Sequence, residues 1–327
     1  MSTERNVLIT GGAGFIGSHL VDKLIAYGEK VTVLDNLNEF YSAQIKRRNI
    51  AKHMESDRFS LIEGDLRSDD DLDRAFKKGK FDVVVHLAGM AGVRPSLLDP
   101  TLYMDVNVLG TQKLINKVLE TNSKSRFIFG SSSSVYGERG GESFLETDRV
   151  DNPISPYAAS KAAGEMLCHT AHHTSGLNAI CLRFFTVYGP RQRPDLAIHK
   201  FCRQIDTGEP IEVYGDGTSK RDYTFISDIV SGITAAMLYN KAPFEIMNLG
   251  RGEPVVLMDL IDLLETELGK EAKIHFKPFQ TGDVPYTFAS IDKARKLLDY
   301  RPRTSTADGV KQFVKWYQDN RIASGVS

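Results

Sequence analysis

Residues 7–20 read VLITGGAGFIGSHL and join a short apolar strand to a glycine turn and then to a helical pattern. Gly11 allows a tight turn after the strand, Gly14 lets a pyrophosphate approach the backbone, and Gly17 lets the helix pack closely on the strand. The free N–H groups at the start of the helix favour an anion there. The stretch therefore predicts a dinucleotide bound at this turn.

An acidic residue follows the second predicted strand. Asp35 lies about 20 residues beyond the glycines, where an acid accepts hydrogen bonds from the adenosine ribose and repels a 2′-phosphate. This position favours NAD over NADP, and an aspartate that only forms a turn before Asn36 is the alternative. We expect Asp65 near the adenine edge. The predicted cofactor contacts around this end are Phe15, Ile16, Asn36, Asp65 and Leu66.

Short apolar runs alternate with helical patterns through the first two-thirds of the chain. Strands connected by helices in this way form a parallel sheet with both faces covered. We therefore predict an α/β fold with a Rossmann-type doubly wound parallel sheet. The predicted strands are 7–10, 30–35, 59–63, 83–87, 126–129 and 178–184, and the predicted helices are 14–27, 69–77, 101–121 and 157–175.

The sequence changes in character after residues 189–190, where prolines, glycines and turn signals become denser. We expect a smaller mixed α/β carboxy-terminal lobe that is partly interwoven with the first. The predicted division is 1–189 for the NAD-binding domain and 190–327 for the smaller lobe, with a soft boundary. Short helices in this lobe are predicted at 225–239, 257–268, 292–298 and 308–318.

Charge and composition exclude several classes of protein. Lys plus Arg number 41 and Asp plus Glu 42, so a formal net charge of −1 attracts neither nucleic acid nor an anionic membrane. No stretch approaches the ~20 apolar residues that span a bilayer, and the apolar run at 7–9 resembles a buried strand rather than a signal peptide. Three cysteines without metal-like spacing favour free thiols in a reducing cytoplasm.

One predicted helix carries a pattern that is compatible with a metal. Cys168 and His172 stand four residues apart, as do His169 and His173, and this spacing can bind a metal ion. A solvated or dimer-facing helix explains the same pattern. We predict no metal.

Tyr157 and Lys161 stand four residues apart in a predicted helix and share one of its faces. A phenol has a pKa of about 10 and is a poor base at neutral pH, but a nearby cation, including a cationic nicotinamide, favours the phenolate. Downstream of a dinucleotide turn, the pair predicts hydride chemistry at an alcohol carbon. A surface tyrosine packed on a lysine stem is the alternative.

Serines occupy all four positions of 131–134, directly after the apolar run 127–129. Ligands of open α/β sheets bind at the carboxyl ends of strands. A hydroxyl at this place can therefore bond a reacting oxygen and relay its proton. Serines that satisfy a turn explain the pattern equally well.

Together these residues resemble the extended short-chain dehydrogenase/reductase superfamily. Within it they are most similar to NAD-dependent nucleotide-sugar epimerases, and among these to UDP-glucuronate 4-epimerases. The resemblance covers nearly the whole chain. The segments that carry it are 11–17, 86–89, 91–94, 131–137, 157–161, 183–190, 191–195 and 221–224.

The resemblance implies roles for the residues at matching positions. Ser132 would be the catalytic partner of Tyr157, and Lys161 would also hold the nicotinamide ribose. The further implied cofactor residues are Leu87, Ala88, Gly89 and the supporting Asn107. The implied substrate residues are Arg94, Arg193, Tyr214 near uracil, Arg221 at the diphosphate, and Asp283.

Positions 132–134 distinguish among such relatives. Sugar-nucleotide 4,6-dehydratases resemble Thr-Asp-Glu here, and UDP-glucuronate decarboxylases usually place Glu before the valine, whereas this chain has only serines. Without a carboxylic acid, elimination of water lacks its proton donor. Neutral hydroxyls instead suit a substrate that brings its own carboxylate, because a buried acid would repel it. We expect Ser133, Ser134 and Thr186 to bind a C6 carboxylate.

The implied reaction interconverts UDP-glucuronate and UDP-galacturonate by oxidation at C4, turnover of the 4-keto sugar and re-reduction, with tightly bound NAD. The resemblance also implies a nucleotide-sugar site on residues 190–327 and a homodimer formed through helices 101–121 and 157–175. The product would supply polysaccharide biosynthesis. The alternatives are a UDP-glucose or UDP-N-acetylglucosamine 4-epimerase, a decarboxylase or dehydratase, and a non-catalytic NAD-sensing protein.

Overall fold

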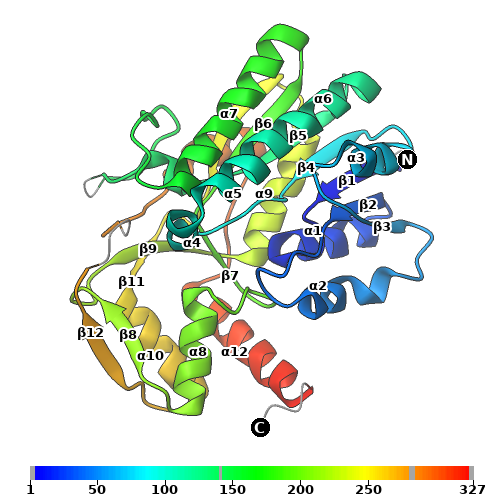
Figure 1. Ribbon diagram of the computed structural model, residues 1–327. Coiled ribbons are helices and arrows are strands. Elements are labelled where there is room, and N and C mark those ends of the chain that lie inside the picture. Colours follow the sequence, from blue (N-terminus) through cyan, green and yellow to red (C-terminus); the bar gives the residue numbers. More distant parts are fainter. Residues whose placement is uncertain (1–3, 140–141, 280–283, 324–327) are drawn as a thin grey trace.

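The computed structural model describes residues 4–139, 142–279 and 284–323. A sheet of seven parallel strands forms its centre, in the order β10-β6-β5-β4-β1-β2-β3 (Figure 1). Chain order reverses between β1 and β4, and ligands of such sheets bind outside the carboxyl ends of the strands at that point. The predicted doubly wound α/β fold is confirmed. The strands are β1 Asn6–Thr10, β2 Lys30–Asp35, β3 Phe59–Glu63, β4 Val83–His86, β5 Arg126–Ser132, β6 Asn178–Phe184 and β10 Phe244–Leu249.

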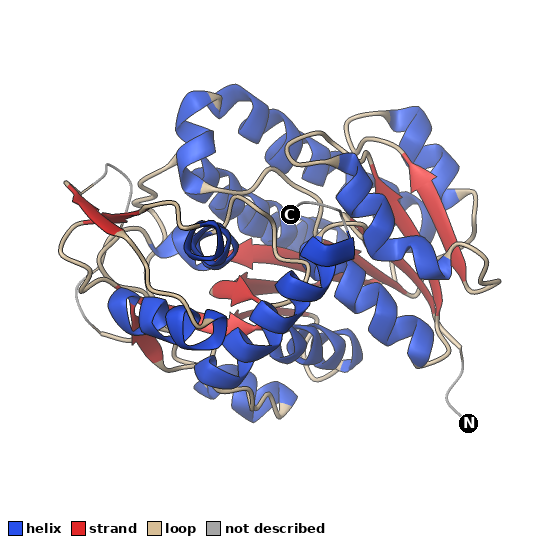
Figure 2. Cartoon of the chain, turned by 90° about the horizontal axis from the view of Figure 1, so that it is seen from below, coloured by secondary structure: helices blue, strands red, loops and turns tan. Residues whose placement is uncertain are grey.

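Helices cover both faces of the large sheet (Figure 2). Because side chains alternate along a strand, Val7 and Ile9 of β1 join the apolar core under α1 and α9, while Leu8 joins the core under α3, α6 and α7. Continuous apolar runs are typical of parallel strands that are buried on both faces. The helices of these layers are α1 Phe15–Ala26, α2 Ala43–Ile50, α3 Asp69–Phe76, α6 Gly110–Asn122, α7 Pro156–Ser175 and α9 Ile226–Leu238.

The helix predicted for 101–121 is present and contains a π-helical turn. α5, Pro100–Met104, is followed by a π-helical turn, η2, at Asp105–Leu109, before α6 begins. This turn buries Asn107, whose side chain is held by neighbouring groups. The predicted helix is therefore confirmed, and its π-turn is a feature that the sequence pattern did not indicate; π-turns of this kind are frequent at functional sites.

β5 continues to Ser132, beyond its predicted end at residue 129. The extension pairs with β6 through the register Ser132↔Phe184. A 3-10 turn, η3, follows at Ser133–Tyr136. The first of the predicted site serines thus stands on a central strand, and its position is fixed by the sheet rather than by a turn.

A smaller lobe lies at the lower left of Figure 1. It contains a three-stranded sheet in the order β11-β9-β7 and a two-stranded sheet, β12-β8. Its strands are β7 Thr186–Tyr188, β8 Ile211–Tyr214, β9 Lys220–Phe225, β11 Pro254–Val256 and β12 Ile274–Lys277. The remaining helices are η1 Ala51–His53, α4 Val93–Leu98, α8 Ala197–Thr207, α10 Leu257–Leu268, α11 Asp292–Leu298 and α12 Thr306–Ala323.

In the described part of the chain, no helix is both long and apolar enough to cross a bilayer. The same residues hold no group of three His, Cys, Asp or Glu side chains that could bind a metal ion. The three cysteines are free and buried. His169 and His172 pack on Phe244, at ring-centroid distances of 5.1 and 5.5 Å, which gives their helical spacing a packing role.

Candidate active site

A cavity of about 590 Å³ lies at the carboxyl ends of the central strands and reaches β9 of the small lobe. It brings together most of the residues predicted from the sequence. The predicted cofactor residues that line it are Gly11, Gly14, Phe15, Ile16, Gly17, Asp35, Asn36, Asp65, Leu66, Leu87, Ala88, Gly89, Tyr157 and Lys161. The predicted substrate residues that line it are Ser132, Ser133, Ser134, Tyr157, Thr186, Arg193 and Arg221.

The glycine turn fits a dinucleotide for two structural reasons. Gly11 has a positive φ of +71°, and a Cβ there would lie 2.7 Å from the backbone nitrogen of Ala88. A Cβ on Gly17 would collide with the Gly11 carbonyl. No side chain of the described residues caps the start of α1 at Gly14, so its N–H groups and the helix dipole can receive a pyrophosphate.

Two acids lie at the other end of the cavity, and backbone N–H groups bind one of them while neighbouring side chains bind the other. Asp35 accepts hydrogen bonds from the N–H groups of Ala13 (3.1 Å) and Leu37 (2.9 Å), and burial raises its pKa. Asn36 donates to Asp65 over 2.9 Å, and Arg67 holds the pKa of Asp65 well below its usual range. Among the described residues that line the cavity, these two acids are the only carboxylates.

α7 presents Tyr157 and Lys161 to the cavity. Ser155 caps the helix by accepting the Ala158 N–H over 3.1 Å, and Pro156 occupies the first turn. Tyr157 therefore stands in the first turn of α7, with Lys161 one turn further along the same face. Lys161 Nζ donates to the Gly130 carbonyl of β5 over 2.8 Å, which ties the helix to the central strand.

The electrostatics of this pair differ from the simple picture of a lysine beside a phenol. Burial raises the pKa of Tyr157, whereas a hydrogen bond with Ser132 and the charge of Arg193 lower it. Burial lowers the pKa of Lys161 to about 8, and Glu165 opposes that shift. The effect of burial is the largest, so the pKa of Tyr157 stays above its usual value. The sequence pattern did not indicate that the charge of Arg193 acts on this phenol.

The serine cluster is an ordered network of hydroxyls. The backbone N–H and the hydroxyl of Ser134 donate to Ser132 Oγ over 3.2 and 2.9 Å. Ser133 and Thr186, from the start of β7, line the same cavity. The network can donate hydrogen bonds to an oxygen of a bound molecule without adding negative charge.

Asn107 lies behind the cavity wall instead of lining it. Its Oδ1 accepts the Met90 N–H over 2.7 Å, and its Nδ2 donates to the Met90 carbonyl and to Ser160 Oγ, both over 2.9 Å. A Cβ on Gly89 would lie 2.9 Å from Asn107 Oδ1. Asn107 thus ties the backbone segment that lines the cavity to the catalytic helix.

Three predicted substrate residues are not among those that line the cavity. Arg94 and Tyr214 stack on each other, with the guanidinium 4.6 Å from the ring centroid. Asp283 lies outside the described residues. Arg193 does line the cavity, where its guanidinium lies 4.7 Å from the Phe40 ring and bonds Asp195 over 2.6 Å.

A buried ion pair behind the catalytic helix was not predicted. The Glu165 carboxylate accepts from Arg183 Nε (2.9 Å) and Nη2 (2.7 Å) and from Ser131 Oγ (2.5 Å). Arg183 also covers the Tyr136 ring at 4.7 Å. The pair therefore joins α7, β5, β6 and η3. The sequence signal that could have found the pair is a charged residue in a largely apolar stretch, as Arg183 is in β6.

Comparison with known proteins agrees with this geometry. The NAD dependent epimerase/dehydratase family model matches residues 7–250. A UDP-glucuronate 4-epimerase from Thermodesulfobacterium geofontis is 39% identical, over 96% of this chain and 96% of that protein.

Solved structures give the same result. The structure of a UDP-glucuronic acid 4-epimerase from Bacillus cereus, in complex with UDP-glucuronic acid and NAD, matches with a TM-score of 0.90 and 37% identity, over 96% of this chain and 99% of that one. A UDP-glucose 4-epimerase from Thermus thermophilus in complex with NAD matches with a TM-score of 0.87 and 32% identity, over 96% and 99%. The chain belongs to the NAD dependent epimerase/dehydratase family.

Proposed function

We propose that this protein is a UDP-glucuronate 4-epimerase, an isomerase that interconverts UDP-glucuronate and UDP-galacturonate with tightly bound NAD. One observation carries the assignment. The cavity joins the dinucleotide turn to Ser132, Tyr157 and Lys161, and it surrounds the reacting region with neutral hydroxyls. Relatives of known activity over nearly the full chain support the same reaction.

The chain's residues divide the catalytic work between them. Tyr157 is the base that removes the proton of the sugar 4-hydroxyl, with the Ser132 hydroxyl bonded to the reacting oxygen. Burial keeps the pKa of Tyr157 raised in this structure, and the positive charge of an oxidised nicotinamide would favour the phenolate. NAD supplies the hydride acceptor and donor and is regenerated in each cycle. The glycine turn would hold its pyrophosphate, Asp35 its adenosine ribose and Lys161 its nicotinamide ribose. The 4-keto sugar turns over within the cavity before the hydride returns to its opposite face.

The hydroxyls of Ser133, Ser134 and Thr186 are the proposed site for the C6 carboxylate. Hydroxyl donors stabilise an anion, whereas a carboxylate at these positions would repel it. The carboxylates that line the cavity from described residues lie at its adenosine end, away from these serines. A 4-keto uronate is a β-keto acid that can lose CO2, so fixing the carboxylate in an unreactive orientation would also protect the intermediate.

The division of the chain at residue 189 remains our proposal, with NAD and catalysis on 1–189 and the nucleotide on 190–327. Arg221 supports it, because this residue lines the cavity from the small lobe and would meet the diphosphate. Arg193 would lie near the nucleotide as well. Strand β10 returns to the large sheet, so the two parts are interwoven.

A homodimer is proposed through the outer faces of α5, η2, α6 and α7. The exposed apolar side chains there include Met104, Leu109 and Met166, at 39, 49 and 57% exposure. Light scattering on the purified protein would give the oligomeric state. We also propose that the enzyme works in the reducing cytoplasm, since its cysteines are free, and that it supplies polysaccharide precursors.

The test is to incubate the purified protein, without added NAD, with UDP-glucuronate, UDP-glucose or UDP-N-acetylglucosamine and to identify the products by proton NMR. UDP-galacturonate from the first reaction alone is expected. Conversion of only the neutral sugar nucleotides would be consistent with the proposed mechanism but would overturn the proposed carboxylate site. The similarity to UDP-glucose 4-epimerases is the reason to include these substrates. UDP-xylose or a keto-pentose would identify a decarboxylase.

A further inference from the structure

Asp222 is a buried carboxylate directly behind the cavity wall. It lies on β9 between Arg221 and Tyr223, which both line the cavity. Since neighbouring side chains on a strand point to opposite faces, Asp222 points away from the cavity, and it is 0% exposed. Burial raises its pKa, which four hydrogen bonds oppose. Nothing in the proposed chemistry uses this acid.

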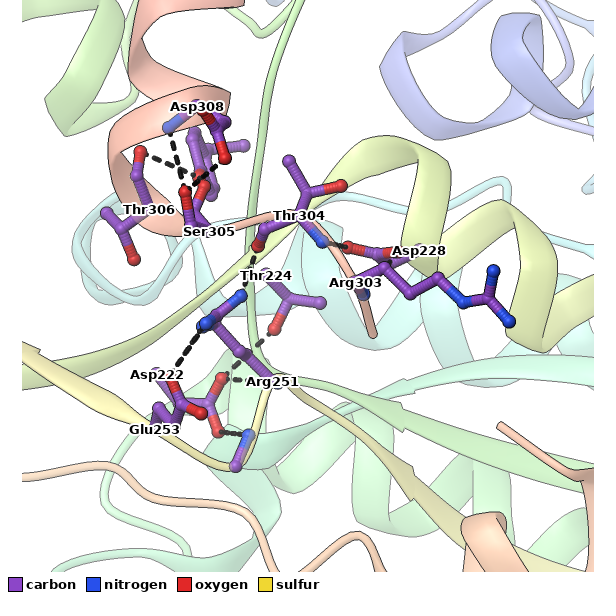
Figure 3. A network of polar contacts seen from close by, with 12 residues as sticks. Asp222, Thr224, Asp228, Arg251, Glu253, Arg303, Thr304, Ser305, Thr306 and Asp308 are labelled. Carbon is purple, nitrogen blue, oxygen red and sulfur yellow. Dashed lines mark hydrogen bonds and ion pairs between the residues drawn. The ribbon is translucent and has the colours of Figure 1, made fainter. Parts of the chain in front are cut away.

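The four donors come from three stretches of the chain: β9 itself, the turn after β10, and the chain near residue 289. Figure 3 labels two of them, Thr224 and Arg251. Asp222 Oδ1 accepts the Arg251 N–H over 2.7 Å and the Thr224 hydroxyl over 3.0 Å. Its Oδ2 accepts the N–H groups of Gly252 over 3.0 Å and Ala289 over 3.1 Å. One carboxylate thus joins β9 to the turn that follows β10 and to the chain near residue 289.

The fit around this carboxylate is close. A Cβ on Gly250 would lie 2.8 Å from Asp222 Oδ2 and 2.5 Å from the Ala289 Cβ. The Arg251 side chain turns elsewhere, to Glu253 and to the Thr304 carbonyl, so it contributes only its backbone N–H to this carboxylate. Within the part of the chain that the structure describes, the acid therefore binds backbone N–H groups and one hydroxyl and forms no ion pair.

The segment before residue 289 forms part of the cavity wall. Val284 and Thr287 line the cavity beside Arg221. The backbone of Lys220 forms two hydrogen bonds with this segment. The Lys220 N–H donates to the Pro285 carbonyl over 2.9 Å, and the Thr287 N–H donates to the Lys220 carbonyl over 3.1 Å. Asp222 extends this pairing of β9 with the segment by accepting the Ala289 N–H.

We propose that Asp222 is a positioning residue that holds Arg221 and the 284–287 segment together as the wall that receives the nucleotide diphosphate. This inference rests on the proposed function, in which Arg221 meets the diphosphate. It assigns to Asp222 an effect on nucleotide binding that is separate from its effect on folding.

The chain contains a matched control. Asp228, six residues further on, is also buried and accepts two backbone N–H groups, those of Arg303 and Thr304, each over 3.1 Å, where Asp222 accepts three (Figure 3). None of these three residues lines the cavity. Asp228 reaches the wall only indirectly, through Thr304 and the Arg251 side chain. Asp228→Asn should therefore reproduce the structural cost of losing such a carboxylate with a much smaller effect on the wall.

The experiment compares Asp222→Asn with Asp228→Asn in the NAD-containing enzyme. Asparagine keeps the size of the side chain but points a donor at N–H groups that need an acceptor. UDP is the probe in calorimetric binding, because every candidate substrate carries it and a wrong sugar assignment leaves the test intact. For Asp222→Asn we expect the Kd for UDP and the KM for the sugar nucleotide to rise about tenfold or more, with kcat and NAD content little changed.

Asp228→Asn should lower the melting temperature but keep the Kd for UDP within about twofold of wild type. Equal Kd values for the two variants would overturn the proposal, as would an unchanged Kd in Asp222→Asn. If that variant does not fold, Thr224→Val removes only the hydroxyl donor, and its Kd should still rise while that of Asp228→Asn does not. A wild-type protein that binds no UDP would overturn the proposed function itself.

Discussion

The two walls of the cavity are held together by different means. On the catalytic side, Glu165 and Arg183 form a fully buried ion pair that joins the helix of Tyr157 to the strand of Ser132. On the nucleotide side, Asp222 binds backbone N–H groups from distant segments. The first wall depends on a pair of opposite charges from a helix and a neighbouring strand, and the second depends on how remote segments meet. The proposed proton transfer, which needs Tyr157 and Ser132 in fixed positions, takes place on the first wall.

The largest effect is expected on the catalytic wall. Tyr157→Phe removes the proton acceptor but keeps the ring, which packs edge-on to Tyr103 at 6.2 Å. We expect kcat to fall by about 10³- to 10⁴-fold, with the bound NAD retained. Turnover assays and the NAD content of denatured protein check this. Substantial remaining activity would contradict the role of Tyr157.

Removing one partner of the Glu165–Arg183 ion pair should lower the free energy of unfolding more than replacing both partners by apolar residues. Glu165→Gln leaves the Arg183 guanidinium buried without a countercharge, which should lower the free energy of unfolding by about 3 kcal/mol or more. In the double variant Glu165→Met, Arg183→Met, most of the lost free energy of unfolding should be recovered. Denaturant unfolding of both variants measures the difference.

The same double variant should still have a reduced kcat, because Ser131 loses the partner that fixes the end of β5 beside Ser132. Denaturant unfolding and turnover on the same preparations separate the two effects. A double variant with wild-type kcat would show that the pair serves stability alone.

The carboxylate site predicts a difference between substrates. Replacing Ser133, Ser134 and Thr186 together by alanine removes neutral donors that line the cavity. We expect kcat/KM for UDP-glucuronate to fall by about 10²-fold, since hydrogen bonds to a charged group are worth more than those to a neutral one. Any UDP-glucose turnover should change far less. Equal losses would count against this site.

The smallest effect concerns pH and again distinguishes the two walls. His86, on the catalytic side, bonds Thr10 Oγ1 over 2.7 Å and Thr111 Oγ1 over 2.8 Å. Burial and the charge of Lys161 lower its pKa to about 3, from about 6.5 in an unfolded chain. Between these values only the unfolded chain binds the proton. His86 should therefore cost up to about 2 kcal/mol of stability as pH falls from 7 to 5.

Unfolding of wild type and His86→Gln at pH 7 and pH 5 measures this cost. The variant should lose less stability on acidification than wild type does. The raised pKa of Asp222 works in the opposite sense, since the folded state then binds its proton more tightly. Identical pH dependence in wild type and variant would mean that His86 titrates normally.

The local motifs that line the cavity were the part that the sequence predicted, for a physical reason. The glycine turn, the alternating strands and the pair Tyr157 and Lys161 are local patterns whose geometry follows from a strand or helix period. The meeting of these motifs at one edge follows from the parallel sheet. Their joint placement in one cavity was therefore predictable before the structure.

The parts that escaped prediction depend on pairing across the fold. The extension of β5 to Ser132 requires its register with β6, and the π-turn at Asn107 requires the backbone of Met90. The stacking of Arg94 on Tyr214 depends on tertiary contact as well. No sequence period indicates such contacts.

The central claim is that the hydride taken from C4 stays in the cavity and returns to the same sugar. The direct measurement is to supply the enzyme as purified, without added NAD, with UDP-glucuronate carrying deuterium at C4 and to examine the product by NMR. We predict UDP-galacturonate that keeps the deuterium at C4. Protium at C4 of the product, or no conversion without added NAD, would contradict the account.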